Sequence, residues 1–142
     1  MTTLFVDTSA FYAIADGDDR HHREALSALR ASVGTEQVVT SDHVVVESWL
    51  LIRSRLGRRA AMAFWDGVTA DVFTVVGVSA PDLRRGREFA REWSDQTFSI
   101  VDCSSFAIME RLAIDRALAF DAHFRVIRLG PRRNRPLRII PH

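Results

Sequence analysis

The chain has 142 residues, of which 47% are hydrophobic and 26% charged, and its formal net charge is +1. These values fit a single globular domain over residues 1–142 and exclude a strongly basic nucleic-acid binder; a membrane protein is excluded because no apolar run is long enough to span. A start without a secretory-signal pattern, and a single cysteine that can form no internal disulfide, favour a cytoplasmic protein.

The local patterns alternate between short apolar runs and apolar residues at helical spacing. In chain order they predict a strand (2–6), two helices (8–15, 20–33), a strand (37–40), two helices (42–56, 61–68), a strand (72–76), a helix (80–93), a strand-like run (99–101) leading into a helix from 102, and strands at 117–120, 125–129 and 138–140. Strands that alternate with longer helices predict the α/β class with a mainly parallel sheet.

Three aspartates, Asp7, Asp102 and Asp121, each follow one of the strand-like runs. Taken singly, each is also explained as an ordinary helix cap. If the three strands are parallel neighbours, their carboxylates converge at the carboxyl edge of the sheet, where ligands bind in such folds. The pattern therefore favours a shared site over three separate caps.

Glu47 lies in V-V-V-E-S-W-L-L-I, which predicts a helix that is apolar on almost every side. A buried carboxylate without a partner is costly, so Glu47 either forms a structural salt bridge, for example with an arginine, or helps to bind a cation. Cys103 is expected to be a buried core residue and not a nucleophile. His123, two residues after Asp121, is either a general base or a polar loop residue.

Four acids that point into one cleft repel each other unless a cation lies among them. An all-carboxylate ligand set suits a hard cation such as Mg²⁺ or Mn²⁺. Zinc is disfavoured because the chain lacks the usual Cys/His ligand spacing.

At this point the chain resembles the PIN-domain ribonucleases, over about residues 4 to 124. The forms L-F-V-D-T-S, F-S-I-V-D-C-S-S-F and A-L-A-F-D-A-H-F are similar to those of the VapC toxins of VapBC toxin–antitoxin pairs. The resemblance rests on Asp7 with Thr8-Ser9, Glu47, Asp102 with Ser105-Phe106, and Asp121 with His123-Phe124.

This resemblance implies a Rossmann-like, three-layer α/β/α fold and a divalent-metal-dependent endoribonuclease that uses Mg²⁺, with Mn²⁺ as a possible substitute. It also implies a homodimer in the prokaryotic cytoplasm and a small antitoxin partner, through which alone the protein contacts operator DNA. The implied catalytic and metal-binding residues are Asp7, Glu47, Asp102 and Asp121. The implied supporting residues are Thr8, Ser9 and Ser105.

Two questions stay open from the sequence. The chain could be a non-catalytic PIN-like module that binds RNA or a protein, and the same acidic chemistry would also serve DNA cleavage. Six arginines near the C-terminus form either a phosphate-binding patch or a solvated tail. They are Arg125, Arg128, Arg132, Arg133, Arg135 and Arg138.

Overall fold

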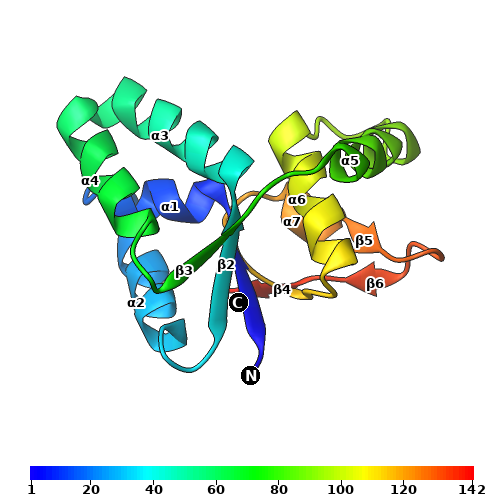
Figure 1. Cartoon of the computed structure of the whole chain (residues 1–142), viewed down its shortest axis with the longest axis horizontal. Helices are drawn as coiled ribbons and strands as arrows, with labels where there is room; N and C mark the ends of the chain where they lie inside the picture. The colour runs from blue at the N-terminus through cyan, green and yellow to red at the C-terminus, as the bar shows by residue number, and fades with distance from the viewer.

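The computed structural model describes residues 1–142 and contains seven strands and seven helices (Figure 1). The strands are β1 (Thr3–Val6), β2 (Gln37–Ser41), β3 (Phe73–Val76), β4 (Arg116–Leu118), β5 (Arg128–Leu129), β6 (Arg135–Pro136) and β7 (Arg138–Ile140). The helices are α1 (Thr8–Ala15), α2 (His22–Ser32), α3 (Asp42–Leu56), α4 (Arg58–Val68), α5 (Ala80–Glu92), α6 (Ile100–Arg111) and α7 (His123–Val126). None of the helices has both the length and the apolarity to cross a membrane.

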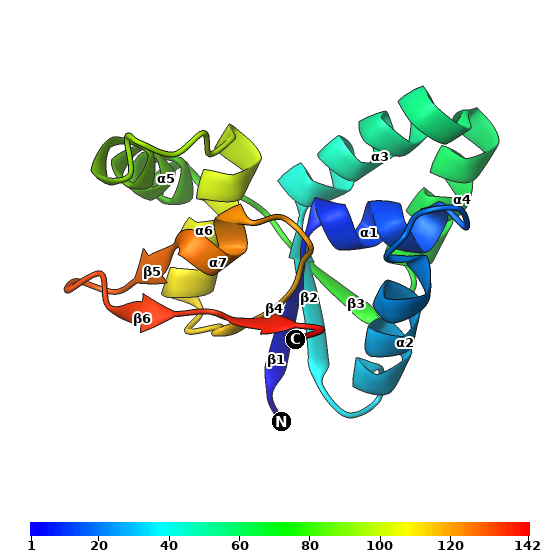
Figure 2. The ribbon, with the colours of Figure 1, turned by 180° about the vertical axis from the view of Figure 1, so that it is seen from behind.

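Five strands form one parallel sheet in the order β3-β2-β1-β4-β7. Helices α1 to α4 lie on one side of this sheet and α5 to α7 on the other, so the molecule has three layers (Figure 1). Figure 2 shows the same layers from behind, with the hairpin of β5 and β6 projecting from the α5–α7 side. The structure confirms the predicted α/β class and the parallel sheet.

The central strand β1 lies in the interior of the molecule. Leu4, Phe5 and Val6 of β1 are all fully buried, because helices cover both faces of the sheet. On one face α5 approaches α6 closely at Gly86, where an added Cβ would lie 3.2 Å from the Cys103 backbone. The absence of a side chain at Gly86 therefore allows α5 and α6 to pack closely together.

Phenylalanines anchor the segments that carry the predicted acids. Phe11, four residues after Asp7, packs on Phe64 with ring centroids 5.2 Å apart. Phe106 and Phe124 are fully buried and contact each other at 5.1 Å. Because Phe106 belongs to α6 and Phe124 to α7, this contact fixes the positions of two acidic segments relative to each other.

Two sequence predictions of strands are wrong. Residues 99–101 form no strand; α6 begins there, because the Ser99 side chain accepts a hydrogen bond from the backbone N–H of Asp102. Residues 125–129 were expected to be one strand, but the single helical turn α7 and the two-residue β5 take their place. Phe124 and Ile127, three residues apart, are both fully buried, and this spacing fits a helical turn better than a strand.

Candidate active site

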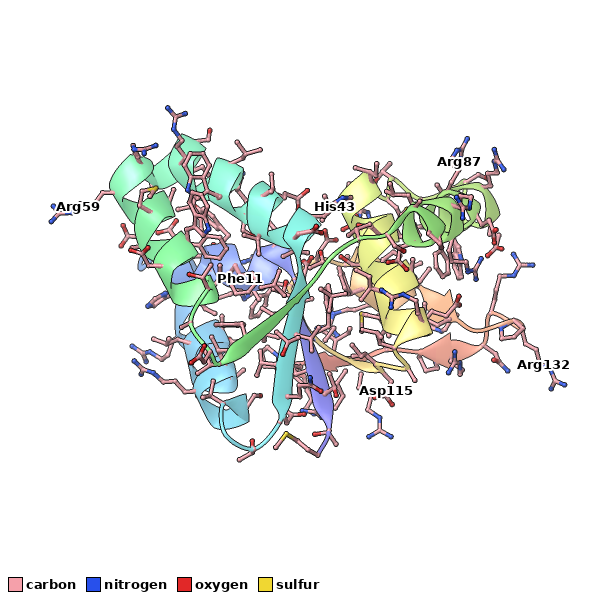
Figure 3. All side chains as sticks on the ribbon, in the orientation of Figure 1. Phe11, His43, Arg59, Arg87, Asp115 and Arg132 are labelled. Atoms are coloured by element: carbon pink, nitrogen blue, oxygen red, sulfur yellow. The ribbon has the colours of Figure 1, made fainter.

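The carboxyl ends of the central strands hold the candidate site. Helices α1 and α3 begin directly at the ends of β1 and β2, and α6 begins on the same side of the molecule (Figure 1). His43 of the first turn of α3 lies between α3 and α6 (Figure 3), with its Nδ1 3.3 Å from the Ser104 hydroxyl. Four elements thus converge here: the ends of β1 and β4 and the first turns of α3 and α6.

Asp7 is the N-cap of α1 and is almost completely buried, with 2% of its surface exposed. Its Oδ2 accepts hydrogen bonds from the Ser9 backbone N–H at 3.2 Å and from the Ser9 hydroxyl at 2.7 Å. The Ser9 hydroxyl in turn accepts the Phe120 backbone N–H at 2.9 Å. Ser9 therefore fixes Asp7 to the chain segment that follows β4, one residue before Asp121.

Asp102 reaches the same region from a helix and not, as predicted, from the end of a strand. It is the third residue of α6, and its Oδ2 accepts the Ser99 backbone N–H at 3.0 Å and contacts Nδ1 of His123 at 2.8 Å. The His123 Nδ1 also lies 3.3 Å from Oδ1 of Asp121. The ligand atoms of Asp102, Asp121 and His123 all lie within 4.8 Å of one another.

Glu47 is half-buried on α3 and forms no ion pair, so the alternative of a structural salt bridge is wrong. Burial raises the pKa of Glu47, and the charges of Asp102 and Asp121 raise it further, while the Thr8 hydroxyl offsets part of this rise. Glu47 therefore lies within electrostatic range of Asp102 and Asp121.

The negative charge of the site is not balanced by arginine. Burial raises the pKa of Asp7 from 3.8 to about 7, against the opposing effect of its hydrogen bonds with Ser9, and the nearby Asp102 charge adds to the rise. His123 is the only basic side chain whose nitrogen lies within 4.0 Å of a carboxylate oxygen of any of the four acids. A bound cation would offset this concentration of two buried and two partly buried carboxylates.

The donor atoms also fit a divalent cation. Oδ2 of Asp7 and Oδ2 of Asp102 accept all of the hydrogen bonds that these residues' side chains make, so each Oδ1 has no partner within the protein. The Ser105 hydroxyl is buried without a partner, and the Thr8 hydroxyl is buried near Glu47 but makes no hydrogen bond of ordinary geometry. Free carboxylate oxygens held in place by their neighbours suit a hard cation, and the His123 nitrogen is one further donor that the sequence did not suggest as a ligand.

Cys103 and the C-terminal arginines, which were also considered from the sequence, lie outside this acidic set. Burial raises the pKa of the Cys103 thiol to about 11, which agrees with a core residue and not a nucleophile. The C-terminal arginines do not act as one group: Arg128 donates to three backbone carbonyls at the end of α7, whereas Arg132 lies at the far tip of the hairpin (Figure 3).

Comparison with known proteins agrees with this geometry. A PIN domain family model matches residues 4–129. The chain therefore belongs to the PIN domain family, to which the acidic residues and the parallel sheet pointed.

Among its relatives is the 23S rRNA-specific endonuclease VapC20 of Mycobacterium tuberculosis H37Rv, which is 36% identical over 123 residues, covering 85% of this chain and 91% of that protein. The crystal structure of VapC20, a Sarcin-Ricin loop cleaving toxin, superposes with a TM-score of 0.78 at 35% identity, covering 84% and 90% of the two chains. DNA-bound VapBC from Salmonella typhimurium matches with a TM-score of 0.67 at 12% identity over 98% and 97% of the chains, which shows the shared fold alone.

Proposed function

We propose that this chain is a divalent-metal-dependent endoribonuclease and the toxin of a type II toxin–antitoxin pair. One observation carries the proposal: Asp7, Asp102 and Asp121 meet, with Glu47 near them, at the carboxyl end of the sheet without a balancing arginine. The likeness to VapC20, whose name describes a 23S rRNA-specific endonuclease, supports RNA as the substrate.

Each residue of the proposed site has a distinct task. Asp7, Asp102 and Asp121 would bind the cation through their free oxygens, and Glu47 would complete the site; Mg²⁺ is the expected ion and Mn²⁺ a possible substitute. Ser9 orients Asp7 through its two hydrogen bonds, and the buried Thr8 and Ser105 hydroxyls would support the acids from within the protein.

The reaction is phosphodiester hydrolysis. A bound divalent cation supplies acidity to water and neutralises charge on the phosphate. The oxygen of water adds to phosphorus and the bond from phosphorus to O3′ breaks, so the products carry a 5′-phosphate and a 3′-hydroxyl. Glu47, with its raised pKa, can hold a proton at a carboxylate oxygen near the reacting groups. The RNA 2′-hydroxyl takes no part, so the preference for RNA comes from other contacts.

Exposed apolar surface supports the protein partners in this proposal. Phe11, Ile14, Leu29 and Phe64 contribute to a largely apolar cavity of about 350 Å³ between α1, α2 and α4, which suits an antitoxin segment. A separate patch, consisting of Val46, Leu50 and Trp65, is 49–58% exposed on α3 and α4 and suits the contact between two copies in a homodimer.

Operator DNA would be contacted only through the antitoxin. Residues 1–142 would act as one domain in the prokaryotic cytoplasm.

The experiment is an RNA cleavage assay with matched variants. Wild type, Asp7→Asn and Asp82→Asn are incubated with a structured RNA pool in Mg²⁺, Mn²⁺ or EDTA, and the product ends are mapped. Asp82 is a control because it is equally buried but pairs with Arg111 away from the acids. We expect metal-dependent cutting by wild type and Asp82→Asn only. Folded wild type that binds no metal and cuts no RNA would contradict the proposal and favour a non-catalytic binding module.

A further inference from the structure

An aromatic pair lies beside the acidic site without a role in it. The rings of His21 and Phe120 are stacked, with centroids 4.4 Å apart and an interplanar angle of 15°. His21 belongs to the connection between α1 and α2, and Phe120 follows β4. Both side chains are only partly buried, so the pair forms part of the molecular surface.

Hydrogen bonds connect this pair directly to the acids. The Phe120 backbone N–H donates to the Ser9 hydroxyl at 2.9 Å, and that hydroxyl donates to Oδ2 of Asp7 at 2.7 Å. Phe120 also immediately precedes Asp121 in the chain. The position of the stack is therefore determined by the same contacts that position two of the acids.

Arg20 adds a cation at the edge of the stack. Its Nε donates to Nε2 of His21 at 3.1 Å, and this is the only hydrogen bond of its side chain. Arg20 is exposed and has no acidic partner, so both terminal guanidinium nitrogens remain available. The loop itself is ordered, because Asp19 accepts the His21 backbone N–H at 2.8 Å and His22 contacts the Ala13 carbonyl at 2.8 Å.

We propose that His21 and Phe120, with Arg20 at their edge, form a nucleobase subsite for one unpaired nucleotide next to the scissile phosphate. The base extends the aromatic stack, and the guanidinium of Arg20 binds the phosphate of that nucleotide. Because every base has an aromatic face, the subsite selects an unpaired nucleotide and not a particular base. This inference rests on the proposed ribonuclease function and names how the site recognises its substrate.

The test is an affinity measurement that does not require cleavage. Binding of a short single-stranded oligoribonucleotide is followed by fluorescence anisotropy in EDTA, with an abasic nucleotide placed at each position in turn. We expect one abasic position to weaken binding to wild type by about 5-fold to 100-fold, the range of a single base stack. Arg30→Ala, which removes an exposed arginine near the end of α2, is the charge control for Arg20→Ala.

Variants of His21 separate stacking from loop structure. His21→Ala should bind intact RNA as weakly as wild type binds the sensitive abasic RNA, with no further loss when both changes are combined, whereas His21→Phe should retain the base-dependent affinity. Equal binding of every abasic RNA by wild type would overturn the subsite, whether or not His21→Ala folds. Cleavage by wild type is scored separately: cutting without abasic sensitivity removes only the subsite, whereas abasic-sensitive binding without cutting removes only the nuclease.

Discussion

Helices α5 and α6 begin with the same capping box but use its aspartate differently. In α5, Ser79 and Asp82 exchange hydrogen bonds of 3.0 and 3.2 Å between side chain and backbone. In α6, Ser99 and Asp102 make the same two bonds, each 3.0 Å long. Both aspartates are buried at the same position of the first turn, so local structure does not distinguish them.

The difference lies in the third group that each carboxylate meets. Both oxygens of Asp82 accept hydrogen bonds from Arg111, at 2.9 and 3.0 Å, and this interaction lowers the pKa of Asp82. Asp102 meets no arginine; it contacts His123 through one oxygen and lies close to Asp121. A buried acid with its own arginine stabilises the fold, whereas buried acids without one have the charge and the free oxygens that a metal-binding site needs.

The largest expected effect is on catalysis. Asp102→Asn should lower the rate of RNA cleavage by at least about 100-fold, because it removes a carboxylate oxygen that no protein group occupies. Asp82→Asn changes the same atom at the same helical position and should leave the cleavage rate of the folded protein unaltered. Single-turnover cleavage with both variants measures the contrast. Equal losses in the two would mean that the capping box, and not the acidic site, explains the effect.

The next effect is on stability and has an unusual sign. The pKa of Asp7 is about 7 in the folded chain and 3.8 in the unfolded chain, so only the unfolded chain loses this proton as the pH rises between these values. Ionisation of Asp7 in the unfolded chain therefore lowers the free energy of unfolding of the metal-free protein progressively from pH 3.8 to about 7, by on the order of a few kcal/mol. Below this range the contribution vanishes.

Replacing Asp7 should consequently raise the stability of the inactive, metal-free protein. We expect Asp7→Asn to unfold at higher urea concentration than wild type in EDTA at mildly alkaline pH, and to lose this advantage in acid. Addition of Mg²⁺ should stabilise wild type and not the variant. Urea titrations across the pH range measure both differences. An Asp7→Asn protein that is less stable than wild type in alkaline EDTA would show that the Ser9 hydrogen bonds outweigh the cost of the buried charge.

The structural aspartate should show the opposite dependence on pH. Because the folded pKa of Asp82 is lowered, its pair with Arg111 contributes stability above the unfolded value of 3.8 and loses it as the pH falls through the folded value. Asp82→Asn should lower the free energy of unfolding at neutral pH by about 1–2 kcal/mol, a modest figure because the Arg111 side chain is 46% exposed. Arg111→Gln should cost a similar amount, and unfolding of the double variant tests whether the two losses overlap.

The convergence of the acids could be predicted from the sequence only in part. Asp7 and Asp121 follow the neighbouring parallel strands β1 and β4, so their convergence could be predicted from the alternation of strands and helices. Asp102 was predicted at the correct edge but on the wrong element, since F-S-I-V is apolar enough for a strand while S-x-x-D favours a helix start. The same S-x-x-D signal begins α5 at Ser79, so the local pattern was enough to predict a helix start. Only the tertiary packing separates the role of Asp102 from that of Asp82.

The contact of His123 with two acids could not be predicted for a related reason. It depends on the single helical turn α7, whose first backbone N–H binds Oδ1 of Asp121 at 2.9 Å. A segment this short has no periodicity from which to predict its structure. The hairpin of β5 and β6, with two residues in each strand, was missed for the same reason.

The smallest expected effect concerns two buried hydroxyls that have no hydrogen-bond partner, Ser105 on α6 and Ser48 on α3. Removing an unpaired buried hydroxyl relieves its desolvation cost, so Ser48→Ala and Ser105→Ala should each change the free energy of unfolding by less than about 1 kcal/mol, or raise it slightly. Ser105 lies one turn beyond Asp102, and its buried hydroxyl is proposed to support the position of that acid. Ser105→Ala should therefore slow cleavage by up to about 10-fold, at the lower limit for an outer-shell contact, while Ser48→Ala should not. If both variants cleave at the wild-type rate, the Ser105 hydroxyl has no role in cleavage. Asp102 would then be the only residue of α6 that contributes to the reaction.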